Sequence, residues 1–246
     1  MTTAEPTSNA GSILRTRGVG RRFGGVQAVR DVTIDVAPGE RRAILGPNGA
    51  GKTTMFNLIA GDFPPTSGSV ELFGQDVTAL PSRARSRIGL ARTYQKSRLF
   101  LGLTVEDNLF LSVVGRDEAI RERAHAMAEQ VWLGQALHER VGSLSHGEQR
   151  QLEVGMALIS RPQLVMLDEP ASGLSRGERG QLTSLLQELD PQVTLILIEH
   201  DMDVALNVAQ KVTMMHDGAV IVEGTPDEIR ANETVHALYL GKGNYE

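Results

Sequence analysis

The stretch GPNGAGKTT, residues 46–54, decides how the rest of the chain is interpreted. An apolar segment, residues 43–45, precedes it, and the composition of residues 55–60 is typical of a helix. Residues 46–53 have the spacing G-x-x-x-x-G-K-[ST] of a P-loop, which joins a strand to a helix. The sequence therefore predicts a strand, a phosphate-binding loop and a helix, in that order.

A loop of this kind binds a nucleoside triphosphate largely through its backbone. Glycines allow successive N–H groups to point at phosphate oxygens, and the helix that follows adds its positive end. Lys52 would place its charge on the outer phosphates, and the Thr53 hydroxyl would ligate Mg²⁺. The predicted nucleotide-binding residues of the loop are Asn48, Gly49, Ala50, Gly51, Lys52, Thr53 and Thr54.

Composition limits the class of protein. The 246 residues allow one or two domains, and the formal net charge of -5 argues against a general nucleic-acid binder. The sequence has no cysteine and therefore no disulfide and no thiolate metal ligand. Its longest apolar runs are too short to span a bilayer, and residues 1–10 lack the apolar core of a signal peptide. We therefore expect a cytosolic protein.

A second apolar segment, residues 164–167, ends abruptly in Asp168 and Glu169. Continuous apolar residues are typical of a buried parallel strand, and ligands in open α/β sheets lie beyond the carboxyl ends of such strands. Asp168 therefore suits the Walker B position that holds Mg²⁺, and Glu169 is placed to orient or deprotonate water. The alternative is an exposed acidic turn, which rarely follows apolar residues so directly.

Two more polar residues come at predicted strand ends. His200 follows the apolar segment 193–198 and is able to donate a hydrogen bond to a terminal phosphate. Gln95 follows a predicted strand and enters a loop, where a neutral amide binds both a metal-held water and a moving segment. Each is a weak signal when taken alone.

Two features have an ordinary structural explanation beside a functional one. Phe23 lies in a glycine turn and either stacks on a nucleotide base or packs at a strand end; its local sequence favours neither. A basic run includes Arg83, Arg85 and Arg87, and we expect these three to form a solvated face.

The segment LSHGEQ, residues 144–149, opens another predicted helix. Ser145 and Glu148 have the spacing of a capping box, which is the structural explanation. The functional alternative is a helix N-terminus that holds an anion. His146 by itself is expected to be a surface side chain, because the other five histidines are scattered.

Taken in this order, the motifs resemble those of the ATP-binding subunits of ABC transporters, over residues 13–241. The resemblance implies that Phe23 stacks on adenine and that Ser145, His146, Gly147 and Glu148 form the signature motif. It implies catalytic roles for Lys52, Gln95, Glu169 and His200, and Mg²⁺ ligation by Thr53, Gln95 and Asp168. The segments ARTYQ, LSHGEQRQLEVGMAL and EHDMD are similar to the branch that serves branched-chain amino acid, amide and urea importers. Ser175 departs from the aspartate that many members have in the D-loop.

The implied fold is α/β, a P-loop NTPase with a mainly parallel core sheet, an antiparallel β portion near the N-terminus and an inserted helical subdomain. We expect disorder in residues 1–11, the ATPase domain in 12–241 with the helical subdomain at 95–155, and a loose tail in 242–246.

The implied function is ATP hydrolysis that powers transport of a small solute across a membrane, with import favoured. The expected partners are two transmembrane permease subunits, a second ATPase subunit that is identical or paralogous, and a solute-binding protein; nucleic acid is not expected. The chain would lie on the inner face of the cell membrane through its permeases. The alternatives are a soluble ABC ATPase that acts on nucleic acid or ribosomes, and an exporter ATPase of the lipopolysaccharide-export type.

Overall fold

The computed structural model describes residues 11–93, 98–113 and 118–240, and its strands form two sheets. The first sheet has the strand order β2-β1-β4-β5 and is antiparallel. It consists of β1 (Leu14–Phe23), β2 (Val26–Val36), β4 (Ser67–Leu72) and β5 (Gln75–Asp76). Residues 1–10 of the segment 1–11 predicted to be disordered, and the predicted tail at 242–246, lie outside the described residues.

The second sheet has the order β10-β9-β3-β8-β7-β6, and only β10 runs antiparallel to its neighbour. Its strands are β3 (Arg41–Leu45), β6 (Leu90–Arg92), β7 (Leu164–Asp168), β8 (Thr194–Ile198), β9 (Lys211–His216) and β10 (Ala219–Gly224). A mainly parallel core sheet beside an N-terminal antiparallel sheet confirms the predicted fold class.

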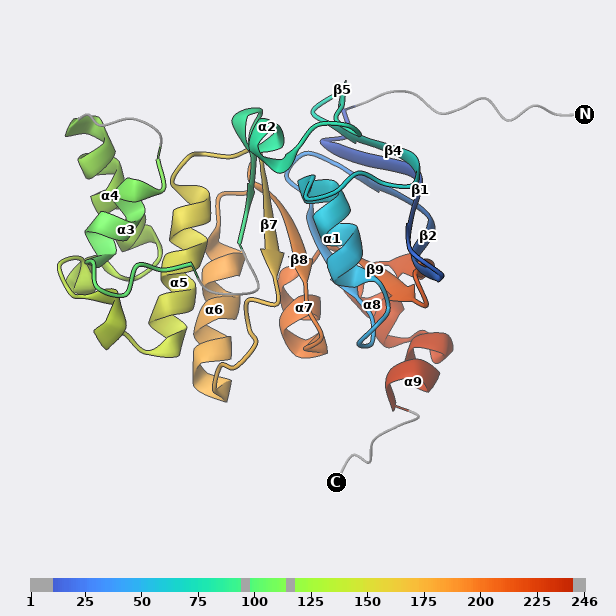
Figure 1. Ribbon diagram of the computed structural model, residues 1–246. Helices are drawn as coiled ribbons and strands as arrows, with labels where there is room; N and C mark the ends of the chain where they lie inside the picture. The colour runs from blue at the N-terminus through green and yellow to red at the C-terminus, as the bar shows by residue number, and fades with distance from the viewer. Residues whose placement is uncertain (1–10, 94–97, 114–117, 241–246) are drawn as a thin grey trace, which may run out of the picture.

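The helices cover both faces of the parallel sheet, as Figure 1 shows. They are α1 (Lys52–Ala60), α2 (Ser82–Arg87), α3 (Val105–Leu111), α4 (Glu118–Gln130), α5 (His146–Leu158), α6 (Arg176–Glu188), α7 (Met202–Val208), α8 (Pro226–Arg230) and α9 (Glu233–Leu240). Helix α1 lies between the two sheets, whereas α3 and α4 lie at the end of the molecule far from β1 and β2 (Figure 1). Helices α5 and α6 pack on the other face of the parallel sheet.

Strands β7 and β8 are buried along their whole length, which explains their continuous apolar sequence. Successive side chains of a strand point to opposite faces of its sheet. Accordingly, Leu164 and Met166 join the core around α1, while Val165 and Leu167 join the core formed with α3 to α6. Because both faces are covered, neither strand needs a polar side.

Polar side chains cap the starts of several helices. Thr104 and Asp107 form a capping box at α3, and Thr225 and Glu228 form another at α8. Two helices follow each other near the C-terminus: α8 ends at Arg230 and α9 begins at Glu233. The side chain of Asn232 accepts hydrogen bonds from the N–H groups of Thr234 and Val235 and so starts the new helix.

The prediction of a solvated basic face is wrong for Arg85. Its side chain is fully buried and donates to five backbone carbonyl oxygens. Two of these belong to Leu58 and Ile59, in the last turn of α1. Burial lowers the pKa of Arg85 to about 10, and the guanidinium satisfies carbonyl groups that the helix end leaves without a partner.

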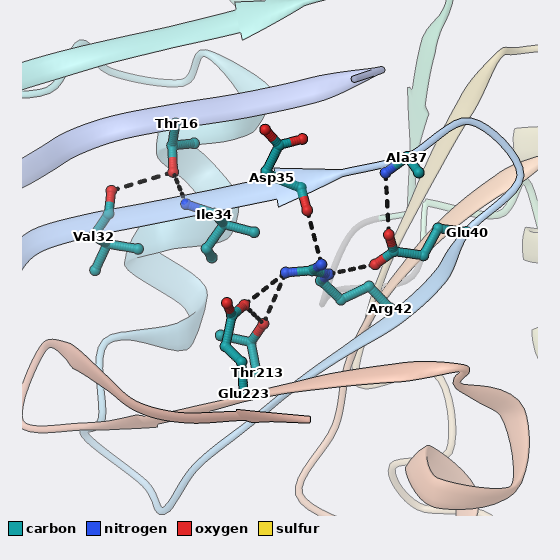
Figure 2. Close-up of polar contacts among 9 residues, drawn as sticks. All are labelled: Thr16, Val32, Ile34, Asp35, Ala37, Glu40, Arg42, Thr213 and Glu223. Atoms are coloured by element: carbon teal, nitrogen blue, oxygen red, sulfur yellow. Dashed lines mark hydrogen bonds and ion pairs between the residues drawn. The ribbon is translucent and has the colours of Figure 1, made fainter. Parts of the chain in front are cut away.

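A second buried guanidinium, that of Arg42 at the start of β3, ties the two sheets together (Figure 2). It donates to Glu40 at 2.6 Å, to Glu223 on β10 at 2.6 Å and to the carbonyl oxygen of Asp35 on β2 at 2.8 Å. Thr213 on β9 accepts from Arg42 at 3.2 Å and donates to Glu223 at 2.6 Å. One cation therefore joins β2, β3, β9 and β10.

We predict that Arg42→Met lowers the free energy of unfolding by about 3 kcal/mol, because it leaves partly buried carboxylates without their cation. Urea denaturation of the nucleotide-free chain measures the loss. Arg230→Met is the control, since it removes an exposed i,i+3 pair and should cost less than about 1 kcal/mol. Equal losses for the two variants would contradict a tie between the sheets.

Candidate functional site

The loop between β3 and α1 has backbone positions that exclude side chains. Gly51 has φ +97°, and a Cβ atom there would lie 2.4 Å from the carbonyl oxygen of Ala28. A Cβ atom at Gly46 would lie 2.3 Å from the carbonyl oxygen of Met215. Glycine is therefore required at position 51 by the close approach of β2 and at position 46 by the close approach of the end of β9.

The loop forms the floor of a cavity of about 810 Å³. All seven predicted loop residues line it, and so does Glu169. The full lining consists of Val26, Gln27, Ala28, Arg30, Asn48, Gly49, Ala50, Gly51, Lys52, Thr53, Thr54, Glu169, Asp217 and Gly218. The predicted phosphate loop and the second predicted acid therefore meet at one cavity.

The wall residues from β2 and from the β9–β10 turn are missing from the predicted site. Gly218 donates its N–H to the carbonyl oxygen of Ala50 at 3.0 Å, and Arg30 donates its N–H to Gly218 at 2.7 Å. The hairpin turn at Asp217 and Gly218 is predictable from sequence. Its place beside the phosphate loop depends on the strand order, which no local pattern reveals.

Lys52 begins α1 and is almost completely buried. Its ammonium group donates to the carbonyl oxygens of Gly46 at 2.6 Å and of Pro47 at 3.1 Å, within its own loop. Burial lowers the pKa of Lys52, while the nearby charges of Glu169, Asp168 and Glu199 raise it. The charge is thus held at the cavity floor, where a phosphate would be stabilised most by a desolvated cation.

Asp168 ends β7 and is 5% exposed. Its Oδ1 atom is buried and accepts no hydrogen bond from any described residue. Burial, and secondarily the charge of Glu169, raises the pKa of Asp168 to about 6, against the opposing effects of Lys52 and Arg92. A buried carboxylate oxygen that accepts no hydrogen bond, beside a triphosphate-binding loop, is well suited to be a ligand of Mg²⁺. This ion usually binds only one or two protein carboxylates and keeps several waters.

No group of three or more His, Cys, Asp or Glu side chains is arranged to hold a metal within the ranges that the structure describes. The predicted Mg²⁺ site is of a different kind, in which one carboxylate and one hydroxyl would act together with phosphate oxygens. Asp168 and Thr53 would be the two protein groups of such a site. The third predicted ligand, Gln95, lies outside the described residues.

Glu169 and His200 come together at the ends of two neighbouring strands. The Nδ1 atom of His200 lies 3.7 Å from Oε1 of Glu169, and the N–H of Glu169 donates to the carbonyl oxygen of Ile198 at 2.8 Å. Glu169 has φ +48°, a left-handed conformation that a non-glycine residue adopts only when its surroundings require it. The backbone therefore turns sharply where the carboxylate reaches the cavity.

Phe23 is 44% exposed and does not line the cavity of the described chain. Its ring lies 5.4 Å from that of Phe63, edge to face, and the guanidinium of Arg21 lies 4.7 Å from its centroid. These contacts are those of the packing alternative. Stacking of Phe23 on a base stays a prediction. The apolar residue of the cavity wall that is nearest to Phe23 in the sequence is Val26, at the start of β2.

The predicted signature motif lies elsewhere on the chain, since residues 145–148 are not among the residues that line the cavity. Ser145 and Glu148 form a capping box at the start of α5, and His146 is exposed as predicted. The N–H of Gly147 donates to the carboxylate of Glu178 at 2.9 Å. That carboxylate also accepts from Ser175, the residue at the predicted D-loop position, so it joins α5 to the start of α6.

The geometry is that of a P-loop nucleotide-binding site with two acids at the end of the adjacent strand. A model of the family described as "ABC transporter" matches residues 29–172, and one described as "Branched-chain amino acid ATP-binding cassette transporter" matches residues 219–244. The chain belongs to the ABC transporter family, as an ATP-binding subunit with ATPase activity.

Two relatives and two solved structures place it within that family. The chain is 36% identical to the high-affinity branched-chain amino acid transport ATP-binding protein BraF of Pseudomonas aeruginosa, over 94% of this chain and 98% of that one. It is 34% identical to the corresponding LivG protein of Escherichia coli, with the same coverage. The ADP conformation of MJ1267, an ATP-binding cassette of an ABC transporter, has TM-score 0.87 and 28% identity over 95% of this chain and all of that one. A nucleotide-free cassette has TM-score 0.86 and 27% identity, over 94% of this chain and 100% of that one.

Among the helices that the structure describes, none has both the length and the apolar character needed to cross a bilayer.

We predict that Asp168→Asn changes the pH dependence of stability in the chain without nucleotide or metal. The pKa of Asp168 is raised from 3.8 to about 6 on folding, so the folded chain binds the proton more tightly. The stabilisation from this proton is complete below about pH 4 and is lost as pH rises through about 6. Asn does not titrate. The free energy of unfolding of the variant minus that of the wild type should therefore be roughly 1–3 kcal/mol higher above pH 7 than at pH 4.

Thermal melts of both chains between pH 4 and pH 8 measure the difference. The relevant quantity is the Tm of the variant minus that of the wild type at each pH, because all other groups then cancel. A difference that is constant across this range would contradict the raised pKa of Asp168.

Proposed function

We propose that this chain is the Mg²⁺-dependent ATPase subunit of a membrane importer of branched-chain amino acids. The observation that carries the chemistry is the approach of His200 to within 3.7 Å of Glu169, which lines the cavity floored by the P-loop. The substrate class rests on the names of the relatives at 34–36% identity and on the C-terminal family match. Nothing in these comparisons favours a soluble ATPase or a lipopolysaccharide-export ATPase.

The residues of the chain have separate tasks in hydrolysis. N–H groups of the loop and the ammonium of Lys52 bind the phosphates, and the hydroxyl of Thr53 and the carboxylate of Asp168 hold Mg²⁺, which neutralises charge on the outer phosphates when bound. Glu169 orients the attacking water and accepts its proton. His200 donates a hydrogen bond to the terminal phosphate and stabilises the charge that develops there.

A second ATPase subunit, identical or paralogous, completes the site. The support is the separation of the signature residues from the cavity of their own chain. The hydroxyl of Ser145 at the start of α5 is able to donate to an anion, and it would act on a nucleotide held by the other subunit. Hydrolysis is then linked to closure of the pair.

Permease subunits carry the solute across the membrane, and a solute-binding protein delivers it. We propose two permeases, with this chain in the cytoplasm on the inner face of the membrane. The test is reconstitution of the chain with permeases and binding protein in lipid vesicles. Turnover should rise when the binding protein is loaded with leucine, isoleucine or valine. Equal turnover with and without permeases would contradict the transporter role, and stimulation by amides or urea alone would contradict the substrate class.

We predict that Glu169→Gln lowers ATP turnover by about 10²–10⁴-fold, the usual contribution of a general base. Binding of Mg-ATP should survive, because the loop, Lys52 and Asp168 are unchanged. Lys52→Ala should instead weaken nucleotide binding together with turnover. Turnover assays and equilibrium titration with a fluorescent ATP analogue separate the two effects.

The control for this pair is Glu188→Gln at the end of α6, which changes an exposed carboxylate away from the cavity. Its turnover should equal that of the wild type. If Glu169→Gln retained more than about a tenth of wild-type turnover, the catalytic role of Glu169 would be wrong.

A further inference from the structure

Glu199 is a fully buried acid next to the proposed catalytic residues, and none of the steps above uses it. It directly follows β8 and precedes His200. Strand β8 pairs with both β3 and β7, so this residue lies at the sheet edge where the phosphate loop and Asp168 also lie. Buried carboxylates are uncommon unless their oxygens have hydrogen-bond donors.

The two carboxylate oxygens of Glu199 accept from two different segments. Oε1 accepts from the N–H of Ala171 at 2.8 Å, and Oε2 accepts from the N–H of His200 at 3.2 Å. Ala171 belongs to the turn that follows Glu169, whereas His200 belongs to the loop after β8. One side chain therefore joins the segments that carry Glu169 and His200.

The turn after β7 depends on this acceptor. Ser172 donates its N–H to the carbonyl oxygen of Glu169 at 3.1 Å, which closes a four-residue turn. Pro170, the second residue of the turn, has no N–H, and Ala171, the third, is buried. Without Glu199 the N–H of Ala171 would be a buried donor without a partner, which is unfavourable.

The backbone conformation of Glu169 also depends on Glu199. Its φ of +48° is unfavourable for a residue with a side chain, so the surrounding bonds must maintain it. Those bonds are the donation from Glu169 N–H to Ile198, the closure of the turn by Ser172, and the bond from Ala171 to Glu199.

We infer that Glu199 is a positioning residue: it fixes the turn that carries Glu169 against the loop that carries His200, and so sets the separation of those two side chains. This inference rests on the proposed roles of Glu169 and His200 in ATP hydrolysis. The electrostatics agree with it. Burial raises the pKa of Glu199, the N–H groups of Ala171, Asp201 and His200 oppose that rise, and the charge of Glu199 helps to keep Lys52 protonated.

Two substitutions remove different numbers of the hydrogen-bond acceptors of Glu199. Glu199→Ala removes both acceptors, whereas the amide of Glu199→Gln accepts at one oxygen only and turns a donor toward the second N–H. We expect Glu199→Ala to lower kcat by about 10–100-fold, the scale of a displacement of roughly 1 Å at a reacting centre. The Kd for ATP should change by less than about threefold, because the phosphate loop is untouched. Glu199→Gln should lie between Glu199→Ala and the wild type.

The matched control is Glu223→Gln, which also converts a carboxylate with two hydrogen bonds into an amide, but within the Arg42 network. If Glu223→Gln, at a similar loss of Tm, lowered kcat as much as Glu199→Ala, the effect would be one of stability and the inference would be overturned.

The Glu169→Gln variant provides a second test of the same inference. Glu199→Ala added to Glu169→Gln should cost less than about a further threefold, because the placement of Glu169 no longer matters.

A readout without turnover keeps this inference separate from the proposed function. Hydrogen exchange of the Ala171 and His200 amides, measured by NMR on the nucleotide-free chain, should accelerate by at least about tenfold in Glu199→Ala and remain slow in Glu223→Gln. Unchanged exchange at both amides would overturn the inference even if turnover fell. If the wild-type chain failed to hydrolyse ATP with its permeases, the proposed function would fail, while accelerated exchange would still support the tie between the two segments.

Discussion

The parallel pairing of β3, β7 and β8 is the constraint on which the whole site depends. Ile44 pairs with Ile198, and Ile198 pairs with Asp168, so the carboxyl ends of three strands lie side by side. The phosphate loop, the acid pair and the Glu199–His200 segment all leave the sheet at that edge. Residues far apart in the sequence form one site because three strands, β3, β7 and β8, end at the same edge of the sheet.

The antiparallel sheet and the β9–β10 hairpin have a direct part in shaping the loop. The carbonyl oxygen of Ala28 excludes a side chain at Gly51, and Gly218 donates to Ala50 from the hairpin. Arg42 joins the strands that supply these contacts, at the opposite end of β3 from the loop (Figure 2). The desolvated charges of Lys52 and Asp168 are thus held in a frame built by both sheets.

The sequence predicted the parts of the fold and site that depend on local patterns. Glycine spacing gave the phosphate loop, and apolar runs ending in acids gave β7 and its two carboxylates. The features that the sequence did not predict depend on tertiary contacts. Arg85 is indistinguishable from the arginines beside it in the sequence, because its partners are backbone carbonyls of α1 and the following segment. The walls from β2 and the hairpin, and the tie through Glu199, depend in the same way on strand order and buried N–H groups.

We propose that the P-loop and the end of β7 together hold one metal–nucleotide site. A crystal structure of the Glu169→Gln chain with ATP and Mn²⁺ tests it directly, because anomalous scattering locates Mn²⁺ without assumptions. We expect the triphosphate to lie against the N–H groups of the 46–54 loop. We expect Mn²⁺ at about 2 Å from the Thr53 hydroxyl oxygen and bound to Asp168 directly or through one water. A triphosphate outside the loop, or a metal that contacts neither Thr53 nor Asp168, would contradict it.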